Sequence, residues 1–280
     1  MLSSAQRRLA LLSLALTASA CDRVVPLSDL RPPELVDQDI SADAEARGRA
    51  VLAEAAAAHG GDVWRQHATW EVVLEDRWSD DWLIKLRSPW PEDATWLRFQ
   101  FVPGASDGRV TFLDGSEEGT TWGLAGGRTY AQRPGGAPEW GEAEHMASRL
   151  PTMQFLIEFP QRITEAQFIA DAGQRTVEGR LCDVVFAAWG AVSPNPDYDQ
   201  FLIYVDAETR HILAMQYTVR KSGRGLLGHR FWSELRKVDG VLLPFFQTSL
   251  RAFEDGEPVH SFIVRELKFD TVAEEALQAP

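Results

Sequence analysis

The 280-residue sequence contains no apolar run long enough to cross a bilayer as a helix. A membrane-spanning helix needs about 20 predominantly apolar residues. The most apolar segment near the start of the chain, residues 9–16, is less than half that length. A helical membrane anchor is therefore not expected.

The motifs of common enzyme and metal sites are also missing. The chain has 6 histidines but no H-E-x-x-H, no C-x-x-C and no G-x-S-x-G motif. Residues 223–228 match G-x-G-x-x-G, but strand-like sequence lies on both sides, whereas a dinucleotide site needs a helix after the glycines. We therefore predict no cofactor, no metal site and no catalytic residues, and expect a protein that is not an enzyme.

Positive charge is scarce, with 28 basic against 41 acidic residues and a net charge of -13. A surface this acidic repels the phosphates of nucleic acids. Nucleic acid is therefore not expected among the partners.

The N-terminus has the pattern of an export signal. Arg7 and Arg8 precede the apolar residues 9–16, and Ala18-Ser19-Ala20 then leads to Cys21. This order is typical of a secretory signal peptide over residues 1–20. The small residues before Cys21 resemble a lipobox, which predicts a lipidated Cys21; ordinary signal-peptidase cleavage at the same bond is the alternative.

Residues 21–40 are rich in proline and acidic residues, and we interpret them as a flexible, solvated tether. Lipidation would place the protein on the periplasmic side of a bacterial envelope membrane, and Asp22 leaves open whether that membrane is the inner or the outer one. If Cys21 is not acylated, it can form a disulfide with Cys182, the only other cysteine. If it is, Cys182 is expected to be a small buried side chain.

The remaining residues, 41–280, are expected to form one domain. Residues 41–58 predict a helix capped by Ser41 and stopped at Gly60-Gly61, with His59 as a cation at its end. A period-two alternation begins at residue 69 and recurs between turn signals such as Asp239-Gly240. The expected strands are 69–78, 82–87, 95–102, 109–114, 119–124, 127–132, 173–179, 181–190, 199–206, 211–220, 229–238, 241–254 and 259–270.

Residues 138–170 interrupt the strands. A helix is expected over 142–150, ended near Pro151, and an apolar cluster follows at 153–159. A sheet this large must curl, split or close. The predicted fold is mainly β (α+β): a large curved antiparallel sheet, or half-barrel, covered by a few helices.

Three stretches resemble the LolA/LolB-like family of bacterial lipoprotein-localisation proteins. They are the helix end His59-Gly60-Gly61-Asp62-Val-Trp64, the strand–turn–strand at 201–212, and Lys237-Val-Asp239-Gly240-Val-Leu-Leu-Pro244. The resemblance implies a curved sheet around helices, an apolar cavity for acyl chains, and a carrier or receptor in place of an enzyme. The chain is longer than the transport proteins, and no cargo-binding residue of the family can be assigned here.

Tryptophan is abundant, with 10 residues, most of them between positions 64 and 122. They either fill the core of a large sheet or line an apolar ligand cavity. For the second interpretation we expect a cavity wall from the first strands and a plug from the apolar cluster. The predicted ligand-binding residues are Trp70, Val72, Leu74, Trp78, Trp82 and Ile84 on the wall, and Phe155, Leu156 and Phe159 on the plug.

The sequence thus predicts a membrane-anchored periplasmic lipoprotein that binds a lipid or another apolar ligand without catalysis, and palmitate is expected among its lipids. Two alternatives stay open. The domain is a scaffold or sensor that binds a protein partner in the envelope, or it is an enzyme whose site is too dispersed to identify.

Overall fold

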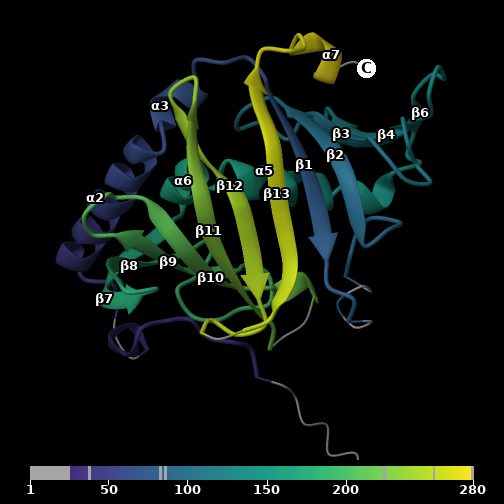
Figure 1. Cartoon of the computed structure of the whole chain (residues 1–280). Helices are drawn as coiled ribbons and strands as arrows, with labels where there is room; N and C mark the ends of the chain where they lie inside the picture. The colour runs from purple at the N-terminus through teal and green to yellow at the C-terminus, as the bar shows by residue number, and fades with distance from the viewer. Residues whose placement is uncertain are drawn as a thin grey trace, which may run out of the picture.

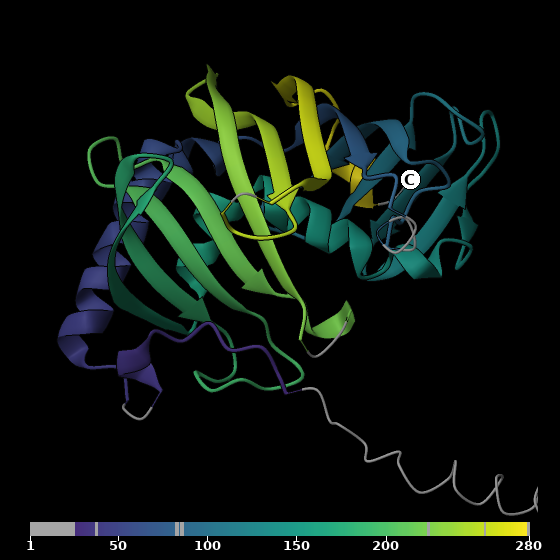
Figure 2. The same ribbon diagram turned by 60° about the horizontal axis from the view of Figure 1, so that its bottom comes forward.

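The chain folds around one 13-stranded antiparallel sheet, which runs in the order β6-β5-β4-β3-β2-β1-β13-β12-β11-β10-β9-β8-β7 (Figure 1). The computed structural model describes residues 26–36, 39–81, 84, 87–222, 225–254 and 256–278. The sheet curves around a helical segment on its inner face (Figure 2). The predicted mainly-β half-barrel covered by a few helices is therefore confirmed.

The strands follow one another along the chain with few interruptions. They are β1 Trp70–Trp78, β2 Ala94–Phe101, β3 Gly108–Phe112, β4 Thr121–Ala125, β5 Arg128–Gln132, β6 Glu139–Trp140, β7 Phe168–Val177, β8 Arg180–Ala188, β9 Gln200–Asp206, β10 Ile212–Thr218, β11 Leu227–Val238, β12 Val241–Leu250 and β13 Pro258–Phe269. The helices are α2 Ala42–Ala58, α3 Gly61–Trp64, α5 Arg149–Ile157, α6 Phe159–Arg162 and α7 Glu275–Gln278. Short 3-10 turns are η1 Pro33–Leu35, η2 Glu144–Met146, η3 Ile163–Glu165 and η4 Arg220–Ser222.

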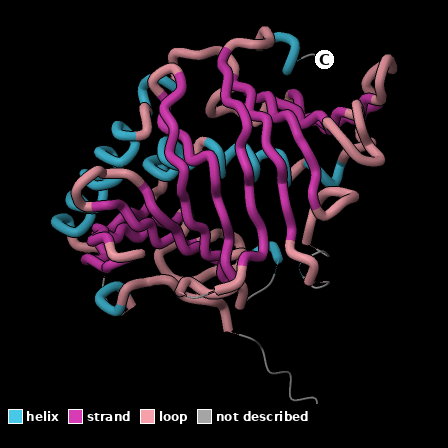
Figure 3. Tube along the Cα trace, in the orientation of Figure 1, coloured by secondary structure: helices cyan, strands magenta, loops and turns pink. Residues whose placement is uncertain are grey.

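The centre of the sheet joins the two ends of the domain. Strands β1 and β13 pair antiparallel along their whole length, from Trp70 opposite Phe269 to Trp78 opposite His260. This pairing places the first strand beside the last one in the middle of the sheet (Figure 3). Residues distant in sequence therefore meet on the inner face of β1, β13, β12 and β11.

Local sequence signals explain several connections. Asp239 and Gly240 connect β11 to β12 with φ angles of 47° and 90°, as a two-residue type I′ hairpin turn requires. The turn between β9 and β10 is held by Asp206, whose carboxylate accepts hydrogen bonds from the backbone of Glu208 and Thr209 and from the Thr209 hydroxyl. Both predicted turns are confirmed.

Helix α2 begins as predicted, because the Ser41 side chain accepts a hydrogen bond from the amide of Ala44. At its other end the prediction of a capping cation is wrong. His59 is fully buried, its Nδ1 lies 2.9 Å from the carbonyl oxygen of Leu242, and its Nε2 accepts from the amide of Ile212. Burial lowers the pKa of His59 to about 4, so the ring is neutral and links α2 to β10 and β12.

Two predicted elements differ from the structure. The strand expected over 82–87 is wrong where it can be checked, because Ile84 is helical and Arg87 lies in a turn. The helix expected over 142–150 is also wrong: that stretch holds η2, and α5 begins only at Arg149. Pro151 lies within the first turn of α5, where a proline leaves no intrahelical hydrogen bond unmade, so it does not end the helix.

The described part of the segment expected to be a solvated tether, residues 26–36 and 39–40, contacts the domain. Leu30 and Leu35 are buried, and the Leu30 amide donates to the side-chain oxygen of Gln200. Arg220 also donates to the carbonyl oxygen of Ser28, at 2.6 Å. Over these residues the chain is therefore docked, and Leu35 packs in an apolar cluster with Phe186, which the composition of the segment did not indicate. Among the described helices, no helix has the length and hydropathy to span a membrane.

Candidate functional site

The inner face of β1 carries three of the predicted wall residues. Trp70, Val72 and Leu74 alternate along the strand, point to the same face and are almost completely buried. All three belong to the main hydrophobic core, which also includes residues from β2, β12 and β13. The predicted period-two register of this strand is thus the register of the structure.

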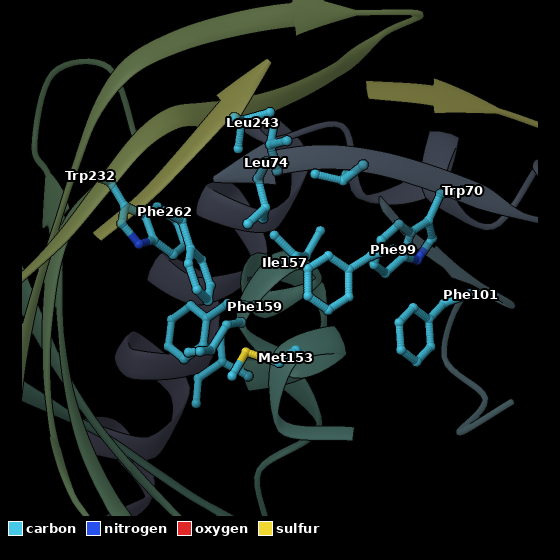
Figure 4. Packing of buried hydrophobic residues seen from close by; sticks show 14 of the residues in the cluster. Trp70, Leu74, Phe99, Phe101, Met153, Ile157, Phe159, Trp232, Leu243 and Phe262 are labelled. Atoms are coloured by element: carbon cyan, nitrogen blue, oxygen red, sulfur yellow. The ribbon is translucent and has the colours of Figure 1, made fainter. Parts of the chain in front are cut away.

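The plug residues lie opposite this wall. We define the plug as α5 together with α6, on the inner side of the sheet (Figure 1). Leu156 and Phe159 are buried in the main core, and Phe155 is half-buried against it. The Phe159 ring meets Trp232 of β11 edge to face, with centroids 5.6 Å apart. Figure 4 shows Met153, Ile157 and Phe159 of the plug facing the side chains of the curved sheet.

The other predicted wall residues lie elsewhere. Trp78 is half-buried at the end of β1 and stacks on His260, with ring centroids 4.1 Å apart. Ile84 is buried in the connection from β1 to β2. Trp82 lies outside the described residues, as does Cys21. The structure therefore brings Trp70, Val72 and Leu74 together with the plug, while Trp78 belongs to a polar group of residues at one end of the sheet.

That polar group is the Arg230 cluster, which we define as Asp76, Trp78, Arg230, Gln247, Ser249 and His260. Its members lie on β1, β11, β12 and β13 and project from the inner face, because directly paired residues share a face. Trp78 is opposite His260, His260 is opposite Ser249, and Ser249 is opposite Arg230.

A chain of contacts crosses the cluster. The Asp76 carboxylate lies 2.6 Å from Nε2 of His260 and accepts from Nε1 of Trp90 at 2.7 Å. Nδ1 of His260 lies 3.1 Å from Nη2 of Arg230, and Nη1 of Arg230 donates to Gln247 at 3.0 Å. Asp76 and Gln247 are completely inaccessible, and Arg230 is only 1% exposed.

The protonation state of His260 follows from these partners. A guanidinium can only donate, so Nδ1 of His260 accepts from Arg230 and Nε2–H donates to Asp76. Burial lowers the pKa of His260, and the neighbouring Arg230 lowers it further, against the opposing effect of Asp76. The cluster therefore holds one buried cation, a neutral imidazole and one carboxylate that does not contact the cation.

A second polar group lies at the opposite end of the inner face. We define the Glu158 cluster as Trp70, Gly104, Gln154, Glu158 and Arg162. Oε1 of Glu158 accepts from Trp70 at 2.7 Å and from Gln154 at 2.8 Å, and Oε2 accepts from the Gly104 amide at 3.1 Å and from Arg162 at 3.4 Å. Burial raises the pKa of Glu158, although all four donors oppose that rise. This carboxylate ties the plug to β1 and to the β2–β3 connection.

Sequence reasoning named neither cluster as a site. One signal was present: Asp76 interrupts the apolar alternation of Trp70, Val72 and Leu74 on the inner face. A charged residue in such a series marks a buried polar partner elsewhere. That the partner is His260 depends on the β1–β13 register, which local patterns do not determine.

Two hollows open at the surface of the described residues. One, of about 400 Å³, lies between the N-terminal segment, α2 and β7, and Ile40, Glu45, Phe168 and Val192 contribute to its lining. The other, of about 140 Å³, lies beside the Glu158 cluster and includes Trp64, Pro103 and Glu165. Neither is walled by the predicted ligand-binding residues.

The part of the chain that the structure describes holds neither a cluster of metal-binding side chains nor a reactive thiol. These residues contain no group of three or more His, Cys, Asp or Glu side chains that could hold a metal ion. Cys182 is buried beneath the outer face, as expected for a small apolar side chain. Burial and the nearby Asp206 raise the pKa of its thiol to about 11, so it is a poor nucleophile.

The chain is similar to known proteins in structure and not in sequence. No protein-family model matches the sequence, and no curated protein matches it. Solved structures do match. A LolA superfamily protein from Nitrosomonas europaea superposes with a TM-score of 0.50 at 12% identity, over 82% of this chain and 96% of that one.

Two further structures are similar to the same extent. A DUF1329 family protein from Desulfovibrio piger gives a TM-score of 0.52 at 14% identity, over 82% of this chain and 96% of that protein. A domain described as an outer membrane lipoprotein-sorting protein, from Vibrio parahaemolyticus, gives 0.51 at 13% identity, over 83% and 96%. The resemblance predicted from three short stretches of sequence is thereby confirmed at the level of architecture: the chain has the LolA-like fold.

Proposed function

We propose that this protein is a non-catalytic binder of lipid acyl chains, which it holds between the inner face of the sheet and the plug. The single observation that carries this proposal is the composition of that interface. The inner face presents a continuous aliphatic and aromatic surface, and the plug that covers it is a nine-residue helix followed by a four-residue helix. An acyl chain offers the same apolar contacts as the plug.

The mechanism is an exchange of apolar contacts. Burying a methylene group contributes about 0.8 kcal/mol, so ten methylenes contribute roughly 8 kcal/mol. Displacing Leu156, Ile157 and Phe159 from the sheet costs an amount of the same order, since each fully buried side chain of this kind is worth about 1.5–3 kcal/mol. Uptake and release of an acyl chain would then be nearly balanced, which suits a reversible carrier or receptor.

The acyl-chain proposal is tested by native mass spectrometry of protein purified from membranes, together with exchange of a fluorescent fatty acid. We expect a copurifying lipid and saturable exchange. Leu156→Trp adds bulk at the plug and should weaken exchange at least about fivefold, because overfilling a packed interface leaves less room for the ligand. The control is Leu181→Trp on β8, where the side chain is 51% exposed. No copurified lipid and no exchange would contradict the proposal.

We further propose that residues 1–20 are a signal peptide and that Cys21 carries the lipid anchor, so that the domain works at the periplasmic face of a bacterial envelope membrane. The order of charged, apolar and small residues before Cys21 supports this location. Cys21→Ser should move the protein from the membrane fraction to the soluble fraction, and the intact mass should lose the acyl groups. An unchanged mass and membrane content in the variant would argue against acylation at Cys21.

A further inference from the structure

Several hydrogen-bond donors of the Arg230 cluster have no acceptor. In the described part of the chain, Nε of Arg230, Nε2 of Gln247, Oγ of Ser249 and Nε1 of Trp78 are all buried atoms without a hydrogen-bond partner. Buried polar groups in folded proteins are nearly always paired, and leaving one unpaired costs about 1–3 kcal/mol. The four groups lie on β1, β12 and β11, which are three of four adjacent strands, and so form a local concentration of unpaired donors.

The four groups lie close together. Trp78, Ser249 and Arg230 belong to one row of the sheet, in which His260 lies between Trp78 and Ser249. Gln247 is two residues from Ser249 on β12 and accepts a hydrogen bond from Arg230. Directly opposite residues have Cα atoms about 4.5–5.5 Å apart, so one small chemical group can approach Arg230, Gln247 and Ser249 together. Trp78 lies three strands from Arg230 and is linked to it through His260, whose ring stacks on Trp78 and whose Nδ1 contacts the guanidinium.

The unpaired groups of the Arg230 cluster need a hydrogen-bond acceptor. Arg230 and Trp78 can only donate, and the Gln247 oxygen is already used by Arg230. The Arg230 cation contacts the ring of Phe262, at 4.6 Å, and the neutral His260, and no carboxylate of the described residues pairs with it. A group that carries several acceptor lone pairs and negative charge matches this set of donors. A metal cation does not match it, because donors and a guanidinium repel positive charge.

The Arg230 cluster lies next to the apolar residues of the inner face. Phe262 beneath Arg230 and Trp232 beside Gln247 both belong to the main core, and Trp232 contacts Phe159 of the plug. Figure 4 shows Trp232, Phe262 and Phe159 next to one another. A ligand whose chain lies between the inner face and the displaced plug would therefore have its head at the end of β1. The half-buried Trp78 lies at that same end, toward solvent.

We infer that the Arg230 cluster binds the oxyanion headgroup, carboxylate or phosphate, of an amphiphile whose acyl chain lies along the inner face. This inference rests on the proposed binding of acyl chains and specifies the class of lipid. The Arg230 guanidinium supplies the charge, and Trp78, Gln247 and Ser249 supply hydrogen bonds. A neutral headgroup of one hydroxyl satisfies fewer of these donors.

The test uses ligands with one chain and different heads. Laurate, dodecyl phosphate and dodecanol are titrated into the full-length protein by calorimetry below their micellar concentrations, with inorganic phosphate as the headgroup alone. We expect at least one of the two oxyanions to bind about tenfold tighter than dodecanol, since hydrogen bonds to charged groups are stronger than neutral ones. Inorganic phosphate should bind far more weakly, because it has no chain to bury.

Two matched substitutions test whether the preference for an oxyanion headgroup arises at the Arg230 cluster. Trp78→Phe keeps the aromatic ring and removes only the donor, and Ser249→Ala removes only the hydroxyl. The double variant should lose most of the tenfold preference and retain its affinity for dodecanol. The control is Thr248→Ala, the next residue along β12, whose hydroxyl contacts Ser261 on the opposite face.

Each outcome is decisive. Equal affinity for oxyanions and dodecanol would overturn the headgroup site and leave acyl-chain binding intact. Phosphate binding as tight as dodecyl phosphate would mean a site for free anions and not for lipid. A preference that survives in the double variant would place the headgroup elsewhere, and failure of every chain to bind would overturn both proposals. If the double variant does not fold, the comparison of heads on the unaltered protein still decides.

Discussion

The two ends of the inner face hold polar clusters of opposite character. In the Glu158 cluster one carboxylate meets four donors, and both of its oxygens are used. In the Arg230 cluster four donors lack an acceptor. Strand β1 spans both, from Trp70 at the Glu158 end to Asp76, about 20 Å away at 3.3 Å per residue, and Trp78, about 26 Å away.

This difference separates a cluster that holds the plug to the sheet from the cluster at which we propose that a headgroup binds. A saturated buried carboxylate fixes its neighbours, and here it fastens the plug to the sheet. A surplus of buried donors stabilises nothing until an acceptor arrives. Substitutions at the two ends should therefore have different effects on stability in the absence of ligand, and the following predictions test that contrast.

The largest effect is expected at Asp76, the one carboxylate within the Arg230 cluster. Asp76→Ala would leave the N–H groups of Trp90 and His260 without acceptors. An unpaired buried donor costs about 1–3 kcal/mol, so the two together should cost about 2–6 kcal/mol. Urea denaturation followed by circular dichroism measures the loss. Asp76→Asn retains one acceptor and should cost less; equal stability of the alanine variant and the parent would show that the cluster is not buried as described.

The next effect is expected at Glu158. Glu158→Gln turns one acceptor oxygen into a donor, so two of its four donors lose their partner, at about 1–3 kcal/mol. The destabilisation should be accompanied by faster proteolysis at the plug, because this side chain links α5 to Trp70 and Gly104. The matched control is Glu165→Gln on the next turn of chain, an exposed carboxylate that pairs with Arg162 at 3.3 Å. A variant as stable as this control would contradict the role assigned to Glu158.

These side chains also show which features of the fold and of the clusters can be predicted from the sequence. Alternation placed Trp70, Val72 and Leu74 on one face, and turn residues such as Asp239-Gly240 placed the hairpins, because both signals are local. The meeting of Asp76 with His260 is set by a pairing between the first and last strands, and no local pattern encodes it. The apolar composition of the plug predicts a segment that covers the sheet, but the bounds of its helix are predicted wrongly. Pro151 is equally compatible with the end of a helix and with its first turn.

A smaller, pH-dependent effect should separate Glu158 from its glutamine variant. Burial raises the pKa of Glu158 above its usual 4.5, so the folded protein binds this proton more tightly than the unfolded chain. The contribution of Glu158 to stability is therefore greatest at low pH and is lost as the pH rises from 4.5 through the folded-state pKa. The difference in unfolding free energy between parent and Glu158→Gln should widen in favour of the parent as the pH falls through this window. A constant difference would mean that the pKa is not raised.

The smallest loss of stability is the sharpest test of the contrast, because it compares two buried hydroxyls. Among the described residues the Ser249 hydroxyl has no partner, so Ser249→Ala loses no hydrogen bond and should leave stability without ligand unchanged or raise it by up to about 1–3 kcal/mol. Thr218 is equally buried, but its hydroxyl accepts from the Gln200 amide and donates to Asp199. Thr218→Val keeps the shape and should cost about 1–3 kcal/mol. Both changes are measured by thermal unfolding. If the alanine variant loses as much as the valine one, Ser249 is already paired in the free protein, and the surplus of donors at that end of the sheet is smaller than four.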